Sequence, residues 1–68
     1  MKATELVTIV PSTTLHEVKL DDLIGRQGKI VELIYGKDGT IGGAWVLLSG
    51  EPYLGESEWF IPINSLIQ

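Results

Sequence analysis

Glycine and proline interrupt this chain so often that no segment is long enough to form an extended helix. The 68 residues include eight glycines and three prolines. Helical spacing of apolar residues is confined to residues 15–23, and Gly25 and Gly28 stop it there. The segments between the glycines are short and rich in β-branched residues, which favour strands. The sequence therefore predicts an all-β domain.

The expected strands follow from these interruptions. They cover residues 5–10, 29–35, 40–49 and 58–63, with a short closing strand at residues 67–68. Residues 36–39, Gly-Lys-Asp-Gly, predict a hairpin loop, and Gly42-Gly43 predicts a bulge in the strand that follows. Residues 11–22 are expected to form a long loop with a short extended piece from His16 to Leu20. Pro62 is expected at a sheet edge or a strand end, and residues 64–66 at a helical turn.

Size and composition limit what can hold such a domain together. The length allows one domain, residues 1–68, with a small core. The chain has no cysteine, which excludes disulfides and cysteine-ligated zinc, and His16 is its single imidazole. We therefore expect no metal and no cofactor. Because 44% of the residues are hydrophobic, more than a small barrel can enclose, part of the apolar surface is expected at an interface.

The charge balance disfavours binding to nucleic acid, which relies on cations that neutralise phosphates. The net charge is −4, and the five cations are scattered over Lys2, Lys19, Arg26, Lys29 and Lys37. No apolar run approaches the length that crosses a bilayer. Residues 1–10 also lack the longer apolar core of a secretory signal. We therefore expect a cytoplasmic protein without a membrane partner.

Residues 61–66, Ile-Pro-Ile-Asn-Ser-Leu, resemble the closing segment of SH3 domains, whose pattern is Ile/Phe-Pro-x-Asn-Tyr-Val. The resemblance implies that Ile61 and Leu66 enter the core and that Pro62 faces a ligand groove. Ser65 stands where SH3 domains carry a groove-lining tyrosine, and residues 5–10 lack the aromatic motif that opens those domains. The resemblance therefore implies an SH3-like barrel more than it implies binding of proline-rich peptides.

Residues 25–32, Gly-Arg-Gln-Gly-Lys-Ile-Val-Glu, are similar to the Gly-x-x-Gly-x-Val segment of bacterial SH3-like barrels, including KOW-type domains of translation and transcription proteins. They also resemble short uncharacterised bacterial proteins with a Gly-x-x-Gly-x-Val-Val-Glu core. The two glycines allow a tight turn and a close strand entry, and Ile30 and Leu33 both enter the core if a bulge lies between them. The KOW likeness implies a nucleic-acid role, for which Arg26, Lys29 and Lys37 would form a modest basic strip.

Aromatic side chains are the strongest binding candidates, because exposed aromatics carry much of the binding energy at interfaces. Successive strand residues face opposite sides of a sheet. If Ile61 is buried, Trp59 shares its face and Phe60 points outward. The predicted partner-binding residues are Tyr35, Trp45, Tyr53, Phe60 and Pro62.

No catalytic residue is expected. The carboxylate pairs Asp21-Asp22 and Glu56-x-Glu58 lie beside turn residues, which favours solvated side chains. His16 lacks the orienting partner that acid–base catalysis needs. Residues 36–43 have the glycines of a phosphate loop without its Gly-Lys-Ser/Thr ending, so a hairpin is favoured.

These observations predict a five-stranded SH3-like barrel with a short 3-10 turn before the last strand. Its expected role is that of a non-enzymatic interaction module or small subunit, which binds a protein partner or a second copy of itself through exposed aromatics. The alternative is a nucleic-acid or ribosome-associated barrel of KOW-like type. An enzyme ranks third.

Overall fold

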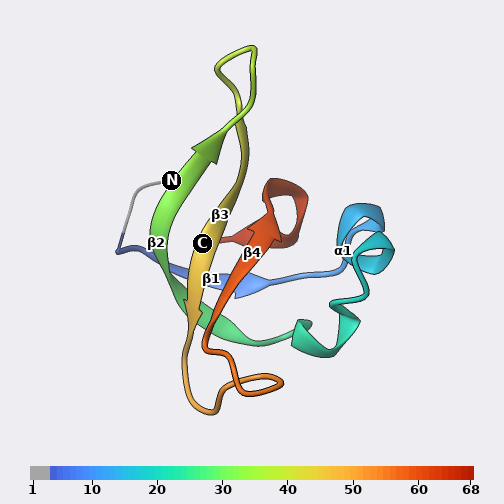
Figure 1. Cartoon of the computed structure of the whole chain (residues 1–68), viewed down its shortest axis with the longest axis vertical. Coiled ribbons are helices and arrows are strands. Elements are labelled where there is room, and N and C mark those ends of the chain that lie inside the picture. The colour runs from blue at the N-terminus through green and yellow to red at the C-terminus, as the bar shows by residue number, and fades with distance from the viewer. Residues whose placement is uncertain (1–3) are drawn as a thin grey trace.

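The computed structural model of the chain describes residues 4–68, so Lys2 lies outside the described residues. Five strands form one antiparallel sheet in the order β4-β3-β2-β1-β5 (Figure 1). They are β1 (Leu6–Ile9), β2 (Gln27–Tyr35), β3 (Ile41–Leu48), β4 (Glu58–Pro62) and β5 (Leu66–Ile67). Strands dominate the described chain, and the all-β prediction is confirmed. The order makes β4 and β5 the two end strands of the sheet.

The long hairpin of β2 and β3 contains two bulges. The register skips Val31 on β2 and Gly42 on β3, so each is an extra residue opposite a continuous partner strand. The bulge at Val31 turns Ile30 and Leu33 to the same side, where Ile30 is buried and Leu33 packs against the core. Gly39 closes the hairpin at a φ of +83°. The bulge at Gly42 and the hairpin loop agree with the sequence prediction, and the bulge at Val31 meets the condition under which Ile30 and Leu33 were expected to share the core.

Two glycines control how the chain enters β2. Gly25 has a φ of +88°, a conformation that side chains with a Cβ rarely adopt. Gly28 lies so close to β3 that a Cβ there would be 2.5 Å from Val46 Cγ1 and 2.6 Å from the carbonyl oxygen of Leu47. The segment from Gly25 to Gly28 therefore serves as the tight turn and close approach that the sequence predicted.

The segment between β1 and β2 differs from the sequence prediction. It contains a short helix, α1 (Thr13–Glu17), and a 3-10 turn, η1 (Asp21–Leu23), in place of a loop with an extended piece. Ser12 caps α1, because its Oγ accepts a hydrogen bond of 3.1 Å from the N–H of Leu15. Leu15 is fully buried, and this contact with the core holds a helix that is too short to be stable alone. No helix in the described part of the chain has the length and apolarity to cross a bilayer.

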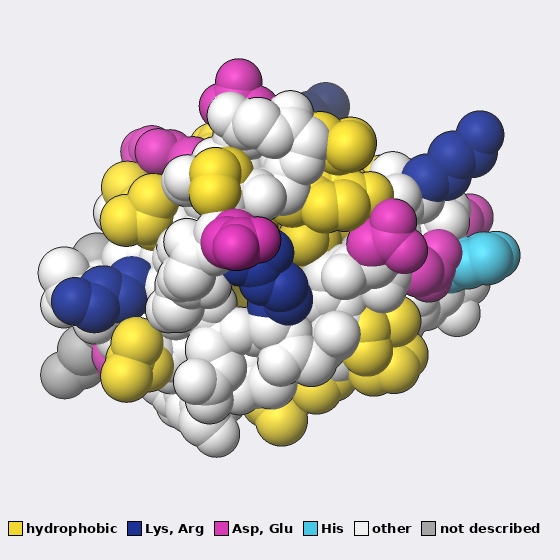
Figure 2. Space-filling view, turned by 90° about the horizontal axis from the view of Figure 1, so that it is seen from below, with side chains coloured by type: hydrophobic (Ala, Val, Ile, Leu, Met, Phe, Trp, Pro, Cys, Tyr) yellow, Lys and Arg dark blue, Asp and Glu magenta, His cyan; other side chains and the backbone are white. Residues whose placement is uncertain are grey.

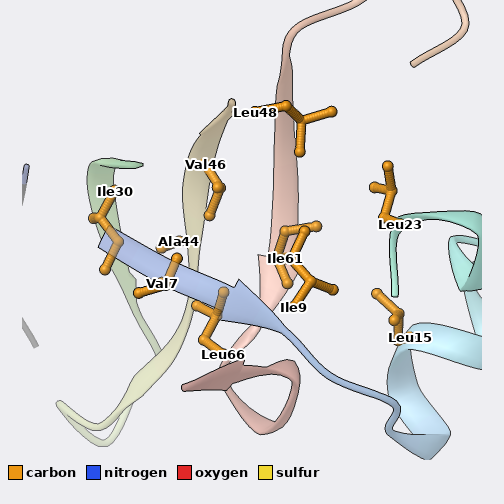
Figure 3. Close-up of a cluster of buried hydrophobic side chains, with 10 residues drawn as sticks. All are labelled: Val7, Ile9, Leu15, Leu23, Ile30, Ala44, Val46, Leu48, Ile61 and Leu66. Atoms are coloured by element: carbon orange, nitrogen blue, oxygen red, sulfur yellow. The ribbon is translucent and has the colours of Figure 1, made fainter. Parts of the chain in front are cut away.

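The core lies between the sheet and the α1–η1 segment (Figure 3). Sheet residues Ile61 and Ile9 face Leu15 and Leu23, which come from α1 and η1. Ile61 and Leu66 are both buried, as their resemblance to SH3 residues implied. A second 3-10 turn, η2 (Ile63–Ser65), directly precedes β5, which agrees with the predicted turn. The remaining core side chains are Val7, Ile30, Ala44, Val46 and Leu48.

Candidate binding groove

An apolar groove of about 520 Å³ lies beside β4. We call it the β4 groove. From the sheet it is lined by Trp45, Glu58, Trp59, Phe60 and Pro62. The segment that begins with α1 contributes Thr14, Val18 and Leu20, and the loop before β4 contributes Glu56. In Figure 1, α1 stands next to β4 on the side away from β3, which explains how these distant segments meet.

Trp45 and Phe60 form the aromatic wall of the β4 groove. They sit opposite each other on β3 and β4, and their rings pack edge to face with centroids 5.9 Å apart. About a third of each side chain stays in contact with solvent, 38% for Trp45 and 37% for Phe60. Gly43 makes room for this arrangement, because a Cβ there would lie 2.6 Å from Phe60 Cζ. The sequence prediction that Phe60 points outward is confirmed.

Trp59 enters the β4 groove from the opposite face of β4 and is fixed in place. Its indole N–H donates to the carbonyl oxygen of Glu56 over 2.9 Å, and its ring packs against Tyr53 with centroids 5.4 Å apart. The Tyr53 hydroxyl donates to Asp22 Oδ2 over 2.9 Å. This hydrogen bond, with a small contribution from burial, raises the pKa of Tyr53 above its ordinary value. Tyr53 therefore connects η1 to the loop before β4.

The groove brings together three of the five residues predicted to bind a partner, namely Trp45, Phe60 and Pro62. Tyr35 ends β2 and is 59% exposed, but it does not line the groove. Tyr53 is half-buried behind Trp59 and does not line it either.

The sequence prediction omitted the α1 side of the groove and Trp59. The omitted lining residues are Thr14, Val18, Leu20, Glu56, Glu58 and Trp59. For Trp59, a signal was present in the sequence. Pro62 marked this strand as an edge or a strand end, and at an edge both faces of the strand can contribute to one surface.

The three cations of the predicted basic strip have different surroundings. The Arg26 guanidinium donates hydrogen bonds to the carbonyl oxygens of Ser49, at 2.8 Å, and Glu51. Arg26 thus holds the loop between β3 and β4. Lys29 is exposed on β2, and Lys37 is exposed in the β2–β3 hairpin loop. None of the three lines the β4 groove.

The polar patterns singled out in the sequence form local contacts. His16 Nδ1 lies 3.1 Å from Asp21 Oδ2 at the surface, and Figure 2 shows the histidine beside acidic side chains. In the β2–β3 loop, Asp38 Oδ1 accepts hydrogen bonds from the hydroxyl and the N–H of Thr40, and these lower the pKa of Asp38. Among residues 4–68, no cluster of three or more His, Asp or Glu side chains is arranged to hold a metal ion.

Exposed hydrophobic side chains also occur outside the set of residues that line the groove, among them Leu6, Leu47, Leu54 and Ile67. Figure 2 shows hydrophobic side chains gathered beside acidic ones on the face seen from below.

Comparisons of the chain with protein-family models, with curated proteins and with solved structures find no match.

Proposed function

We propose that this chain is a non-enzymatic protein-interaction module or small subunit that binds a protein partner, or a second copy of itself, through the β4 groove. The observation that carries the proposal is the paired exposure of Trp45 and Phe60 on the wall of an apolar groove. Aromatic side chains in such positions are typical interface anchors, because they offer a large contact area and have few rotamers to order.

We also propose that the sheet is an SH3-like barrel and that the protein works in the cytoplasm. Five short antiparallel strands and a 3-10 turn directly before β5 support the barrel. A chain without cysteine is compatible with a reducing compartment. Because a fold of this kind serves many activities, the functional proposal rests on the groove and not on the fold.

Capture of partners from a lysate of the source cells tests the proposal. The tagged wild-type chain is compared with Phe60→Ala and with Tyr35→Ala, each with and without nuclease. Neither ring belongs to the buried core, since Phe60 is 37% and Tyr35 59% exposed, so neither substitution opens that core. Of these two residues, Phe60 lines the groove and Tyr35 does not. Tyr35→Ala is therefore a matched control for the loss of an exposed aromatic ring, and urea unfolding checks that both variants are folded.

The proposal predicts a protein that survives nuclease, binds the wild type and Tyr35→Ala, and is lost with Phe60→Ala. Equal capture by all three chains would contradict a role for the groove. Material that disappears with nuclease would instead support the KOW-like alternative, and its retention should then fall steeply with added salt.

A further inference from the structure

Among residues 4–68, no strand pairs with the outer edge of β4. Hydrogen-bonded and non-hydrogen-bonded residue pairs alternate along antiparallel strands. The N–H of Leu48 donates to the carbonyl oxygen of Ser57 over 2.7 Å, which makes these two residues a hydrogen-bonded pair. Following the register, the backbone of Trp59 also faces β3, whereas that of Glu58 and Phe60 faces away from the sheet.

This edge offers hydrogen-bonding groups at regular spacing. Glu58 and Phe60 each present one N–H and one C=O outward. Pro62 has no N–H. It is buried and is the N-cap residue of η2, so its C=O accepts the first hydrogen bond of that turn. Within residues 4–68, the outward backbone groups of Glu58 and Phe60 make no backbone hydrogen bond to another element. An added strand could therefore pair with β4 over the stretch from Glu58 to Phe60, and Pro62 would end the pairing.

The β4 groove follows this edge. Trp59 lies on the core face of β4 and Phe60 on the opposite face, yet both line the same groove. A groove reached from both faces of a strand must pass over the edge of that strand. Across it, Val18 and Leu20 form the opposite apolar wall. Alternate side chains of a strand in this position would meet Phe60 on one side and Trp59 on the other.

Charge selects among possible occupants. Glu56 and Glu58 are the charged residues among those that line the groove, and no Lys, Arg or His is among its lining residues in the described chain. A second copy would bring another net charge of −4 against these carboxylates. A partner segment that carries Lys or Arg is complementary to them. Glu58 and Pro62 also limit pairing with arbitrary strand edges, since charge and proline are common protections there.

We propose that the β4 groove binds an extended peptide segment of a partner protein, which adds to β4 as a further strand. The segment has alternating apolar side chains that contact Phe60 and Trp59, and at least one Lys or Arg that faces Glu56 or Glu58. Backbone hydrogen bonds to the edge hold the segment, and the apolar and acidic parts of the groove select its sequence. This inference rests on the proposed function, because it specifies the ligand of the same groove.

Peptide display followed by amide exchange tests the inference. Random peptides displayed on phage are selected on the whole wild-type chain and counter-selected on Phe60→Ala. The best peptide is synthesised, and amide hydrogen exchange of the chain is measured by NMR with and without it. Strand addition predicts that the amides of Glu58 and Phe60 slow by about tenfold or more. The amide of Trp59 already pairs with β3, so it serves as the internal reference.

Two variants check the recognition chemistry. Two N-methylated peptides are compared, one methylated at the odd-numbered backbone nitrogens and one at the even-numbered ones. One of the two should lose binding and the other should keep it, because only every second N–H faces β4. Glu58→Gln keeps the shape of the side chain and removes its charge. It should weaken a Lys- or Arg-containing peptide by about three- to tenfold, and an uncharged analogue of the peptide should be unaffected.

A selected peptide that occupies the groove without protecting Glu58 and Phe60 would overturn strand addition and leave the proposed function standing. Failure to select any peptide that distinguishes the wild type from Phe60→Ala would also overturn it. The lysate capture then decides the function separately, since a folded partner lost with Phe60→Ala would retain the interaction role without a peptide ligand.

Discussion

Replacing Ser12 by alanine is expected to destabilise the protein by about 2–4 kcal/mol, although the substitution removes a single hydroxyl group. Ser12 Oγ accepts the N–H of Leu15 and shares a hydrogen bond of 2.5 Å with Ser65 Oγ. Loss of the helix cap costs about 1 kcal/mol. Ser65 is fully buried, so loss of its partner leaves a buried hydroxyl unpaired, which costs about 1–3 kcal/mol more.

Replacing the other member of the pair, Ser65→Ala, should reduce the free energy of unfolding by less. It removes the buried hydroxyl itself, and Ser12 keeps its bond to Leu15 and has partial access to solvent. The expected loss is about 0.5–1.5 kcal/mol, the net value of one hydrogen bond. In the double variant no hydroxyl is left unpaired. Its destabilisation should therefore fall short of the sum of the two single variants by about 1–2 kcal/mol.

Urea unfolding followed by tryptophan fluorescence measures all three variants. The slope of the free energy of unfolding against urea must stay constant for the comparison to hold. Additive effects, or a larger loss for Ser65→Ala than for Ser12→Ala, would contradict the assignment of Ser12 as the hydrogen-bond partner of the buried Ser65 hydroxyl. The contact matters for the groove because it fastens the start of α1 to η2, and α1 supplies Thr14 to the groove wall.

Two further predictions concern the surroundings of the groove. Gly43→Ala should destabilise the protein by about 1–3 kcal/mol, because the new Cβ would lie 2.5 Å from the carbonyl oxygen of Ile61. Gly42→Ala is the control, because its Cβ would be 3.7 Å from the nearest atom. Urea unfolding should show that Gly42→Ala changes the stability by no more than about 0.5 kcal/mol. Asp22→Ala should lower the pKa of Tyr53, measured by NMR titration of the ring, because the hydroxyl loses its acceptor. Since the pKa of Tyr53 is raised in the folded state, the stabilisation from its hydrogen bond to Asp22 is present below about pH 10 and disappears as the pH rises through the folded-state pKa. An unchanged pKa of Tyr53 in Asp22→Ala would contradict the assignment of Asp22 as the acceptor.

The strands were predictable because their boundaries depend on local chemistry. The Asp-Gly hairpin loop and the bulge at Gly42 are determined by residues that are neighbours in sequence. The bulge at Val31 entered the sequence analysis as a condition, since Ile30 and Leu33 could share one face only with an extra residue between them, and the structure meets that condition. Such features need no knowledge of distant parts of the chain.

Helix α1 was missed because its stability is not local. Five residues are too few for apolar periodicity to appear, and the alternation of apolar and polar residues after His16 favoured an extended segment instead. The one local signal was Ser12, a favourable N-cap residue directly after Pro11. What holds the helix is tertiary, namely the burial of Leu15 and the contact with Ser65, which is 53 positions away from Ser12.

The groove was half predictable for the same reason. Trp45 and Phe60 could be proposed from residue type and strand alternation alone. Val18 and Leu20 could not, because they reach the groove only once α1 has packed beside β4. Trp59 was assigned to the core face, and it does lie there. Its contribution to the groove depends on the edge position of β4, which the order of strands in the sheet determines.

Binding of the partner by the β4 groove can be measured as the affinity of a purified partner for two alanine variants. The partner obtained by capture is titrated against the wild type, Phe60→Ala and Tyr35→Ala by calorimetry. If the groove binds the partner, Phe60→Ala weakens binding by about tenfold or more, whereas Tyr35→Ala binds as the wild type does. Equal affinities for the two variants, or a loss confined to Tyr35→Ala, would contradict binding through the groove.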